Sequence, residues 1–149
     1  MATRRQAREW CFQMLFQLDM NPRELPVVLK EFWKIRKTDS KTRAFAEALV
    51  TGVRDHLAEI DAKIKEYAHN WDIKRIGCVE RNVMRMALYE ILFCKDVPPV
   101  VAINEAVDIT KYFGNAESGK FVNGILDHAR KDLARPARGD GGDPEPKQG

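Results

Sequence analysis

Long apolar runs, paired cysteines and clustered histidines are all missing from this chain of 149 residues. Without a run of about 18 apolar residues, the sequence predicts no membrane-spanning helix. The N-terminus lacks the apolar region of a secretory signal, so we expect a cytoplasmic protein. The cysteines Cys11, Cys78 and Cys94 are odd in number and far apart, and none belongs to a C-x-x-C pair. We interpret them as buried, reduced thiols.

Metal-ligand spacing and a strong charge imbalance are absent too. The three histidines are scattered and form no His-x-x-x-His pair, so we predict neither a metal site nor a cofactor. The formal net charge is only +3. The first eight residues nevertheless contain Arg4, Arg5 and Arg8 and no acidic residue. This basic arm favours a local contact with an anion such as phosphate, and the alternative is a solvated helix start.

No segment shows the alternation of a β-strand, and no internal repeat is present. Apolar stripes of helical period run through residues 7–18, 25–35, 45–67, 79–92, 103–113 and 121–133. The third stripe is long enough for two helices, with a break expected near residues 56–58. The stripe over 79–92 covers more than one face, which indicates a central, buried helix. The sequence therefore predicts an all-α protein.

Turn and capping residues mark the expected helix ends. Asn21-Pro22 ends the first helix, and the segment Thr38-Asp39-Ser40 supplies N-cap residues for the third. Gly114 fits a C-cap, and Ser118 fits the N-cap of the last helix. After Arg135-Pro136 the composition turns to Gly, Pro, Asp and Lys, which predicts a disordered tail. We expect one folded domain over residues 1–134 and a tail over 135–149.

Two phenylalanines interrupt the pattern of the first helix. Phe12 and Phe16 are spaced i, i+4 but lie off its apolar stripe. We therefore expect a second surface to cover them.

The segment GNAESGKF, residues 114–121, resembles a phosphate-binding P-loop of the form G-x-x-x-x-G-K-[ST]. A P-loop follows a strand, whereas the preceding segment has helical period. Phe121 also stands where a Ser or Thr hydroxyl should bind magnesium. We therefore reject a nucleotide hydrolase.

The same segment still suits RNA. The amides of Ser118, Gly119 and Lys120 would start a helix, which favours an anion. Phe113 and Phe121 flank them, and an aromatic ring beside such donors can stack a single-stranded base. The alternative is that both rings are core residues of their own helices.

Four motifs together resemble the NusB family of bacterial transcription antitermination factors, over about residues 3–130. The first is the arginine-rich start at residues 4–9, and the second runs from Arg75-Ile76 through Val79–Glu90. The third is VPPVVAINEAV at residues 97–107, and the fourth is KFVNGILD at residues 120–127. The last two, in this order and at this spacing, are the most specific.

The resemblance implies about seven helices in two sub-bundles and no catalysis. It also implies binding of single-stranded boxA RNA from ribosomal RNA operons, as a heterodimer with NusE, a protein of the small ribosomal subunit. Within a larger complex of Nus factors and RNA polymerase, such a protein would promote read-through of terminators and rRNA synthesis.

Carried over to matching positions, the resemblance implies two surfaces. The implied RNA-binding residues are Arg4, Arg5, Arg8, Phe113, Glu117, Ser118, Lys120 and Phe121. The implied NusE-binding residues are Phe16, Glu80, Arg81 and Arg85, and the alternative for the three charged ones is ordinary surface ion pairing. Two positions depart from the family pattern: Glu117 stands where Asp is common, and Pro99 follows Pro98.

Two other functions fit the same fold. One is the detached RNA-binding domain of an rRNA cytosine methyltransferase, which would need a large α/β domain beyond this chain. The other is a protein-only helical adaptor, which would not need Arg4, Arg5, Arg8 and Lys120 on one side.

Overall fold

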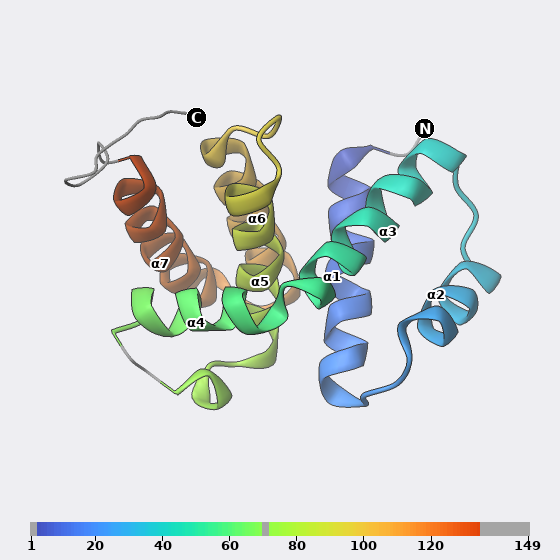
Figure 1. Cartoon of the computed structure of the whole chain (residues 1–149), viewed down its shortest axis with the longest axis horizontal. Coiled ribbons are helices and arrows are strands. Elements are labelled where there is room, and N and C mark those ends of the chain that lie inside the picture. Colours follow the sequence, from blue (N-terminus) through green and yellow to red (C-terminus); the bar gives the residue numbers. More distant parts are fainter. Residues whose placement is uncertain (1–2, 70–71, 135–149) are drawn as a thin grey trace.

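The computed structural model describes residues 3–69 and 72–134, which form seven α-helices and one 3₁₀ turn (Figure 1). The helices are α1 (Arg4–Met20), α2 (Leu25–Lys34), α3 (Ser40–Asp55), α4 (Leu57–Tyr67), α5 (Cys78–Phe93), α6 (Pro99–Phe113) and α7 (Ala116–Ala134), and the turn is η1 (Ile73–Arg75). The predicted all-α class is confirmed. The predicted disordered tail, residues 135–149, falls outside the described residues.

The helices form two groups, as expected. Figure 1 shows α1, α2 and α3 on one side and α4 to α7 on the other. Helix α5 joins the groups because it packs against α1 and α3 as well as α4, α6 and α7. Its buried side chains follow more than one face, which confirms the predicted central helix; they are Asn82, Val83, Met84, Met86, Ala87, Leu88 and Glu90. None of the described helices is long and apolar enough to cross a membrane.

Local sequence explains most helix boundaries. The Thr3 hydroxyl accepts a hydrogen bond from the Gln6 amide at the start of α1, and the Asp39 carboxylate accepts one from the Thr42 amide at the start of α3. The Thr42 hydroxyl and amide together lower the pKa of Asp39. Pro99 opens α6, where a missing N–H costs no hydrogen bond.

The predicted break in the long third stripe is confirmed at His56. This residue separates α3 from α4 with φ −116° and ψ 21°, outside helical geometry. The short turn η1 was missed because three residues give no periodic signal. After α4, His69 has φ 56°, in the left-handed region, and residues 70–71 lie outside the described ranges.

Two local predictions were wrong. Ser118 does not cap α7, because the helix begins at Ala116 and the Asn115 side chain accepts the Ser118 amide at 2.8 Å. The thiols are not all buried: only Cys11 is, whereas Cys78 and Cys94 are partly exposed. Burial raises the pKa of the Cys11 thiol well above its usual range.

Candidate RNA and partner interface

The junction between α6 and α7 is a tight turn. Its Gly114 amide donates to the Thr110 carbonyl at 2.7 Å, which closes α6 as predicted. On the other side, the Asn115 carbonyl accepts the Gly119 amide at 3.1 Å. The amides of Ser118 and Gly119 are therefore occupied, and the expectation that they stay open for phosphate is wrong. Because a helix precedes the turn, the P-loop alternative has no structural support.

A side-chain hydrogen bond links this junction to α5. The Ser118 hydroxyl donates to the Glu80 carboxylate, which comes from the first turn of α5. Gly119 packs closely against α6, since a Cβ added there would lie 2.8 Å from Lys111 Cγ. Ser118 and Gly119 thus hold the start of α7 against α5 and α6.

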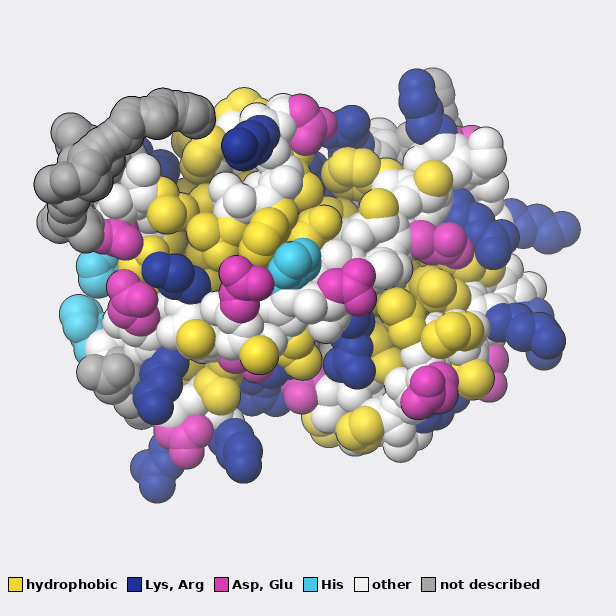
Figure 2. Space-filling view, in the orientation of Figure 1, with side chains coloured by type: hydrophobic (Ala, Val, Ile, Leu, Met, Phe, Trp, Pro, Cys, Tyr) yellow, Lys and Arg dark blue, Asp and Glu magenta, His cyan; other side chains and the backbone are white. Residues whose placement is uncertain are grey.

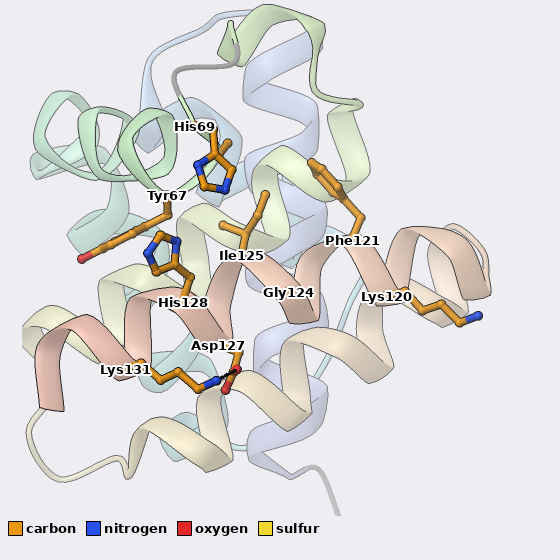
Figure 3. A pocket seen from close by; sticks show the side chains of 10 residues that line it. Tyr67, His69, Lys120, Phe121, Gly124, Ile125, Asp127, His128 and Lys131 are labelled. Carbon is orange, nitrogen blue, oxygen red and sulfur yellow. Dashed lines mark ion pairs between the residues drawn. The ribbon is translucent and has the colours of Figure 1, made fainter.

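The two candidate stacking rings open onto different hollows. Phe113 lines a hollow of about 340 Å³ between α1, α5 and α6; the other lining residues are Phe12, Gln13, Phe16, Gln17 and Val79. Phe121 lines a second hollow between the end of α4 and α7 (Figure 3). Both rings are partly buried and pack against the core. Each ring therefore packs against the core, as the alternative interpretation predicted, and also borders a hollow.

The Phe113 hollow brings together residues assigned to different surfaces. Phe16, the expected partner anchor, is partly exposed in the same hollow as Phe113. Between them lies Phe12, which is only 2% exposed. Its ring centroid is 4.9 Å from that of Phe113 and 6.0 Å from that of Phe16. The second surface that was expected to cover Phe12 is the C-terminal end of α6.

Charged residues at the start of α7 are solvent-exposed. The side chains of Lys120 and Glu117 are 78% and 87% exposed, and their charged atoms are 3.9 Å apart. An ion pair this exposed contributes little to stability. Lys120 is therefore available to an anion such as a phosphate group.

The three arginines of the N-terminal arm differ in their surroundings. Arg4 is exposed, and its guanidinium lies 4.5 Å from the centroid of the Phe45 ring. Arg5 is partly exposed and pairs with Glu105 and Asp108 of α6. Arg5 and Phe12 of α1 both contact α6, through Glu105 and Phe113, and they are two helical turns or about 11 Å apart along α1.

Arg8 is buried, at 3% exposure. It donates two hydrogen bonds of 2.8 Å to the Glu90 carboxylate and one of 3.1 Å to Glu105. Burial alone would lower the pKa of Arg8, but the bonds to Glu90 and the nearby carboxylates raise it. The expectation that Arg8 meets phosphate is not supported by this placement, because its guanidinium is used to join α1, α5 and α6.

The arginines assigned to partner binding also have internal partners. Arg81 donates to Asp19 at 2.8 Å and to the Ile76 carbonyl at 2.6 Å. Arg85 donates to both oxygens of Asp61, at 2.8 and 2.9 Å. Burial would raise the pKa of Asp19, but hydrogen bonds from Asn82 and Arg81 lower it. These pairs fasten α5 to α1 and α4, which agrees with the ion-pairing alternative, although the acids are not the expected neighbours.

Sequence reasoning missed the hollow beside Phe121, which has a volume of about 640 Å³. Tyr67 and His69 at the end of α4 lie next to His128 of α7 on one side of it, and Phe121 lies on the other side (Figure 3). These residues are far apart in the chain, so no spacing rule brings them together. The one available signal was Gly124, a glycine inside a helical stripe.

The rest of the described surface offers no metal site: among the residues that the structure places, no group of three His, Cys, Asp or Glu side chains is arranged to hold an ion. Figure 2 shows apolar side chains gathered above α4, where α5 and α6 overlap in the view of Figure 1. The exposed large apolar residues of α5 and α6 include Phe93, Val100 and Val101.

Comparison with known proteins identifies the family. The model of the NusB family matches residues 5–131. The chain is 46% identical to the transcription antitermination protein NusB of Trichlorobacter lovleyi over 127 residues, 85% of this chain and 89% of that protein.

Solved structures agree with this relationship. T. maritima NusB superposes with a TM-score of 0.80 at 38% identity, over 88% of this chain and 92% of that one. A chain in the crystal structure of the antitermination factors NusB and NusE with dsRNA gives 0.80 at 30% identity, over 87% of this chain and 96% of that one. The chain described here belongs to the NusB family.

Proposed function

We propose that this protein is a transcription antitermination factor of the cytoplasm that binds single-stranded boxA RNA of ribosomal RNA operons together with NusE. In that role it promotes read-through and rRNA synthesis, within a complex that includes other Nus factors and RNA polymerase. Residues 1–134 act as one binding domain. The relatives carry the name of an antitermination protein rather than of an enzyme, and a NusB–NusE complex with RNA is among the similar structures.

One structural observation carries the RNA assignment. On either side of the α6–α7 junction, Phe113 and Phe121 each present a partly exposed ring to a hollow. Next to Phe121, the charged Lys120 is mostly exposed. Rings that stack bases beside a cation that meets phosphate are the usual elements of single-strand binding. Arg4 and Arg5 extend this surface along α1, and Glu117 lies at its edge. Arg8 is left out because it is buried.

The partner surface is proposed at the α1 side of the hollow that Phe113 lines, which we call the groove. Phe16 is the apolar anchor, since it is partly exposed beside Phe113 and has Gln13 and Gln17 around it. Glu80 is near this groove, because its neighbour Val79 lines it. Arg81 and Arg85 hold α5 in place at this surface through ion pairs with Asp19 and Asp61. Because both proposed surfaces include residues of this groove, the RNA and the partner protein would bind next to each other.

A titration tests the proposal. A short labelled boxA-type RNA is titrated with the protein, with and without NusE, at 50 and 200 mM salt. We expect tighter binding with NusE, and a loss of about 7- to 18-fold in affinity at the higher salt for two or three phosphate contacts to a single strand. A duplex of the same sequence and a scrambled single strand serve as controls.

The outcomes separate the candidate functions. If NusE binds but no RNA does, the protein is a helical adaptor and the RNA assignment fails. If duplex and scrambled RNA bind as tightly as boxA RNA, the single-strand and sequence preferences are wrong although RNA binding stands.

A further inference from the structure

Gly124 lies well inside α7, where a glycine destabilises a helix relative to alanine. The other glycine in this helix, Gly119, is explained by packing, because the aliphatic part of the Lys111 side chain lies close to it. No such contact exists at Gly124: among the described residues, no atom lies within 4 Å of a Cβ added there. The internal packing of the fold therefore gives no reason for Gly124. A glycine on an open surface allows another molecule to approach the backbone closely.

The space beside Gly124 is the hollow that Phe121 lines, and three further ring side chains cluster on the side opposite Phe121 (Figure 3). The rings of Tyr67 and His128 are 5.3 Å apart, and those of His69 and His128 are 5.8 Å apart. The Tyr67 hydroxyl donates to Asp132 at 2.9 Å, which fixes that ring in place. Flat rings around an open space of this size suit a flat, polarisable ligand.

Charge at this hollow favours an anionic ligand. Lys120 and Lys131 stand toward the two ends of the α7 wall, and both are mostly exposed. Asp127 is the one acid among the described lining residues. It is already paired with Arg130 at 2.8 Å and with Lys131 at 3.2 Å. A ligand with a flat ring and a phosphate satisfies both the rings and the lysines, which an acidic peptide does not.

We propose that this hollow binds one nucleobase of a single-stranded RNA, with the ribose–phosphate backbone passing close to Gly124. The inference rests on the proposed function and extends it, because the strand would continue past Phe121 to the end of α4. The base packs against the rings of Phe121 and His128, and Lys120 or Lys131 meets the adjoining phosphates. Gly124 acts by leaving the space that the nucleotide occupies.

Filling the hollow tests the proposal. Gly124→Leu places a side chain into the space, whereas Asn123→Leu adds the same side chain to the adjacent, exposed position, which does not line the hollow. The boxA-type RNA of the previous experiment is titrated with both variants and the unchanged protein, and circular dichroism verifies their folding. We expect Gly124→Leu to weaken RNA binding roughly 5- to 150-fold, the effect of losing one stacked base, and Asn123→Leu to leave it within about twofold.

A series of shortened RNAs supplies a second measurement. Removing the nucleotide that occupies the hollow should weaken binding to the unchanged protein but cause no further loss for Gly124→Leu. Equal RNA affinities for the two leucine variants, or the same loss on shortening for both proteins, would overturn the proposal while RNA binding itself stands.

NusE affinity distinguishes the remaining outcomes. We expect it to be unchanged in Gly124→Leu. If this variant loses NusE binding and keeps RNA binding, the hollow belongs to a protein partner and the inference is wrong. If the unchanged protein binds no RNA at all, the proposed function and this inference both fail.

Discussion

Ser118 donates a hydrogen bond to the carboxylate of Glu80, and this bond joins the first turn of α7 to the first turn of α5. Ser118 was assigned to RNA and Glu80 to the partner protein. The bond places the two residues in contact, so the two proposed surfaces meet at this side-chain pair.

This contact should appear as a coupling free energy. Ser118→Ala, Glu80→Ala and the double variant are compared by urea unfolding. Because the acceptor is charged, we expect the sum of the two single losses of stability to exceed the loss in the double variant by about 1–2 kcal/mol. Glu80→Gln keeps an acceptor and should retain most of the stability. Additive losses would show that the bond contributes nothing in solution.

Alanine variants of Arg8 and Arg4 should separate effects on stability from effects on RNA binding. Arg8→Ala leaves the buried Glu90 without its partner, so we expect a loss of about 3–5 kcal/mol in the free energy of unfolding. Arg4→Ala should change stability by less than about 0.5 kcal/mol, because Arg4 is exposed. In the RNA titration, Arg4→Ala should lower affinity and reduce the salt dependence. An Arg8 variant that folds normally but binds no RNA would contradict this division.

Variants of Phe121 and Phe16 should separate the loss of RNA binding from the loss of partner binding. Phe121→Ala is expected to weaken RNA binding by about 1–3 kcal/mol, the value of one stacked base, and to leave NusE affinity unchanged.

Phe16→Asp places a charge in the apolar groove and should weaken NusE binding, while RNA binding by the protein alone persists. Val27→Asp, at an exposed apolar position of α2 that does not line this hollow, is the matched control. Calorimetry with NusE and anisotropy with RNA measure the two affinities. A variant that loses both activities together with its fold would identify that ring as a core residue only.

Acid should destabilise the protein through Asp19 and Glu105. Burial would raise the pKa of each, but hydrogen bonds lower it, from Asn82 and Arg81 to Asp19 and from Arg5 to Glu105. Since the pKa is lower in the folded than in the unfolded chain, the unfolded chain takes up protons first as pH falls. The stabilisation is therefore complete above about pH 5 and is lost below it.

Thermal unfolding between pH 3 and pH 7 measures this effect. Asp19→Asn should flatten the acid side of the profile and should lower stability at pH 7. An unchanged profile in this variant would show that Asp19 is not a source of the acid sensitivity.

Gly124→Ala should stabilise the free protein. Alanine is the better helix former by up to about 1 kcal/mol, and no described atom obstructs its methyl group. Thermal unfolding measures the gain, and Gly124→Ser is a control with lower helix propensity. A loss of stability would show that the added methyl group does meet an obstacle.

The sequence predicted local features well because they depend on neighbouring residues. The helical stripes and the cap at Asp39 follow from residues within a few positions of one another, and the length of the third stripe predicted a break near residues 56–58. The burial of Arg8 did not follow, because Glu90 and Glu105 come from distant helices. The residue that covers Phe12 did not follow either, because Phe113 comes from the distant helix α6. The cap of α7 was predicted at Ser118, whereas the Asn115 side chain accepts the Ser118 amide; both residue types fit the role of a cap, and only the structure distinguishes them.

The candidate site shows the same division. Motifs identified the α6–α7 junction and its two rings, since those residues are contiguous in the chain. The hollow beside Gly124 required the end of α4 to meet α7, which no motif describes.

The buried ion pairs of Arg8 also bear on synthesis of the protein. Arg8 is made near the start of translation, whereas Glu90 and Glu105 are made much later. Until α5 has left the ribosome, a guanidinium that belongs in the core has neither of these acids to pair with, so it stays in water and α1 cannot dock in its final position. The first helix to be made is therefore secured only after α5 has been made, and a nascent chain truncated before Glu90 should remain accessible to proteases and chaperones.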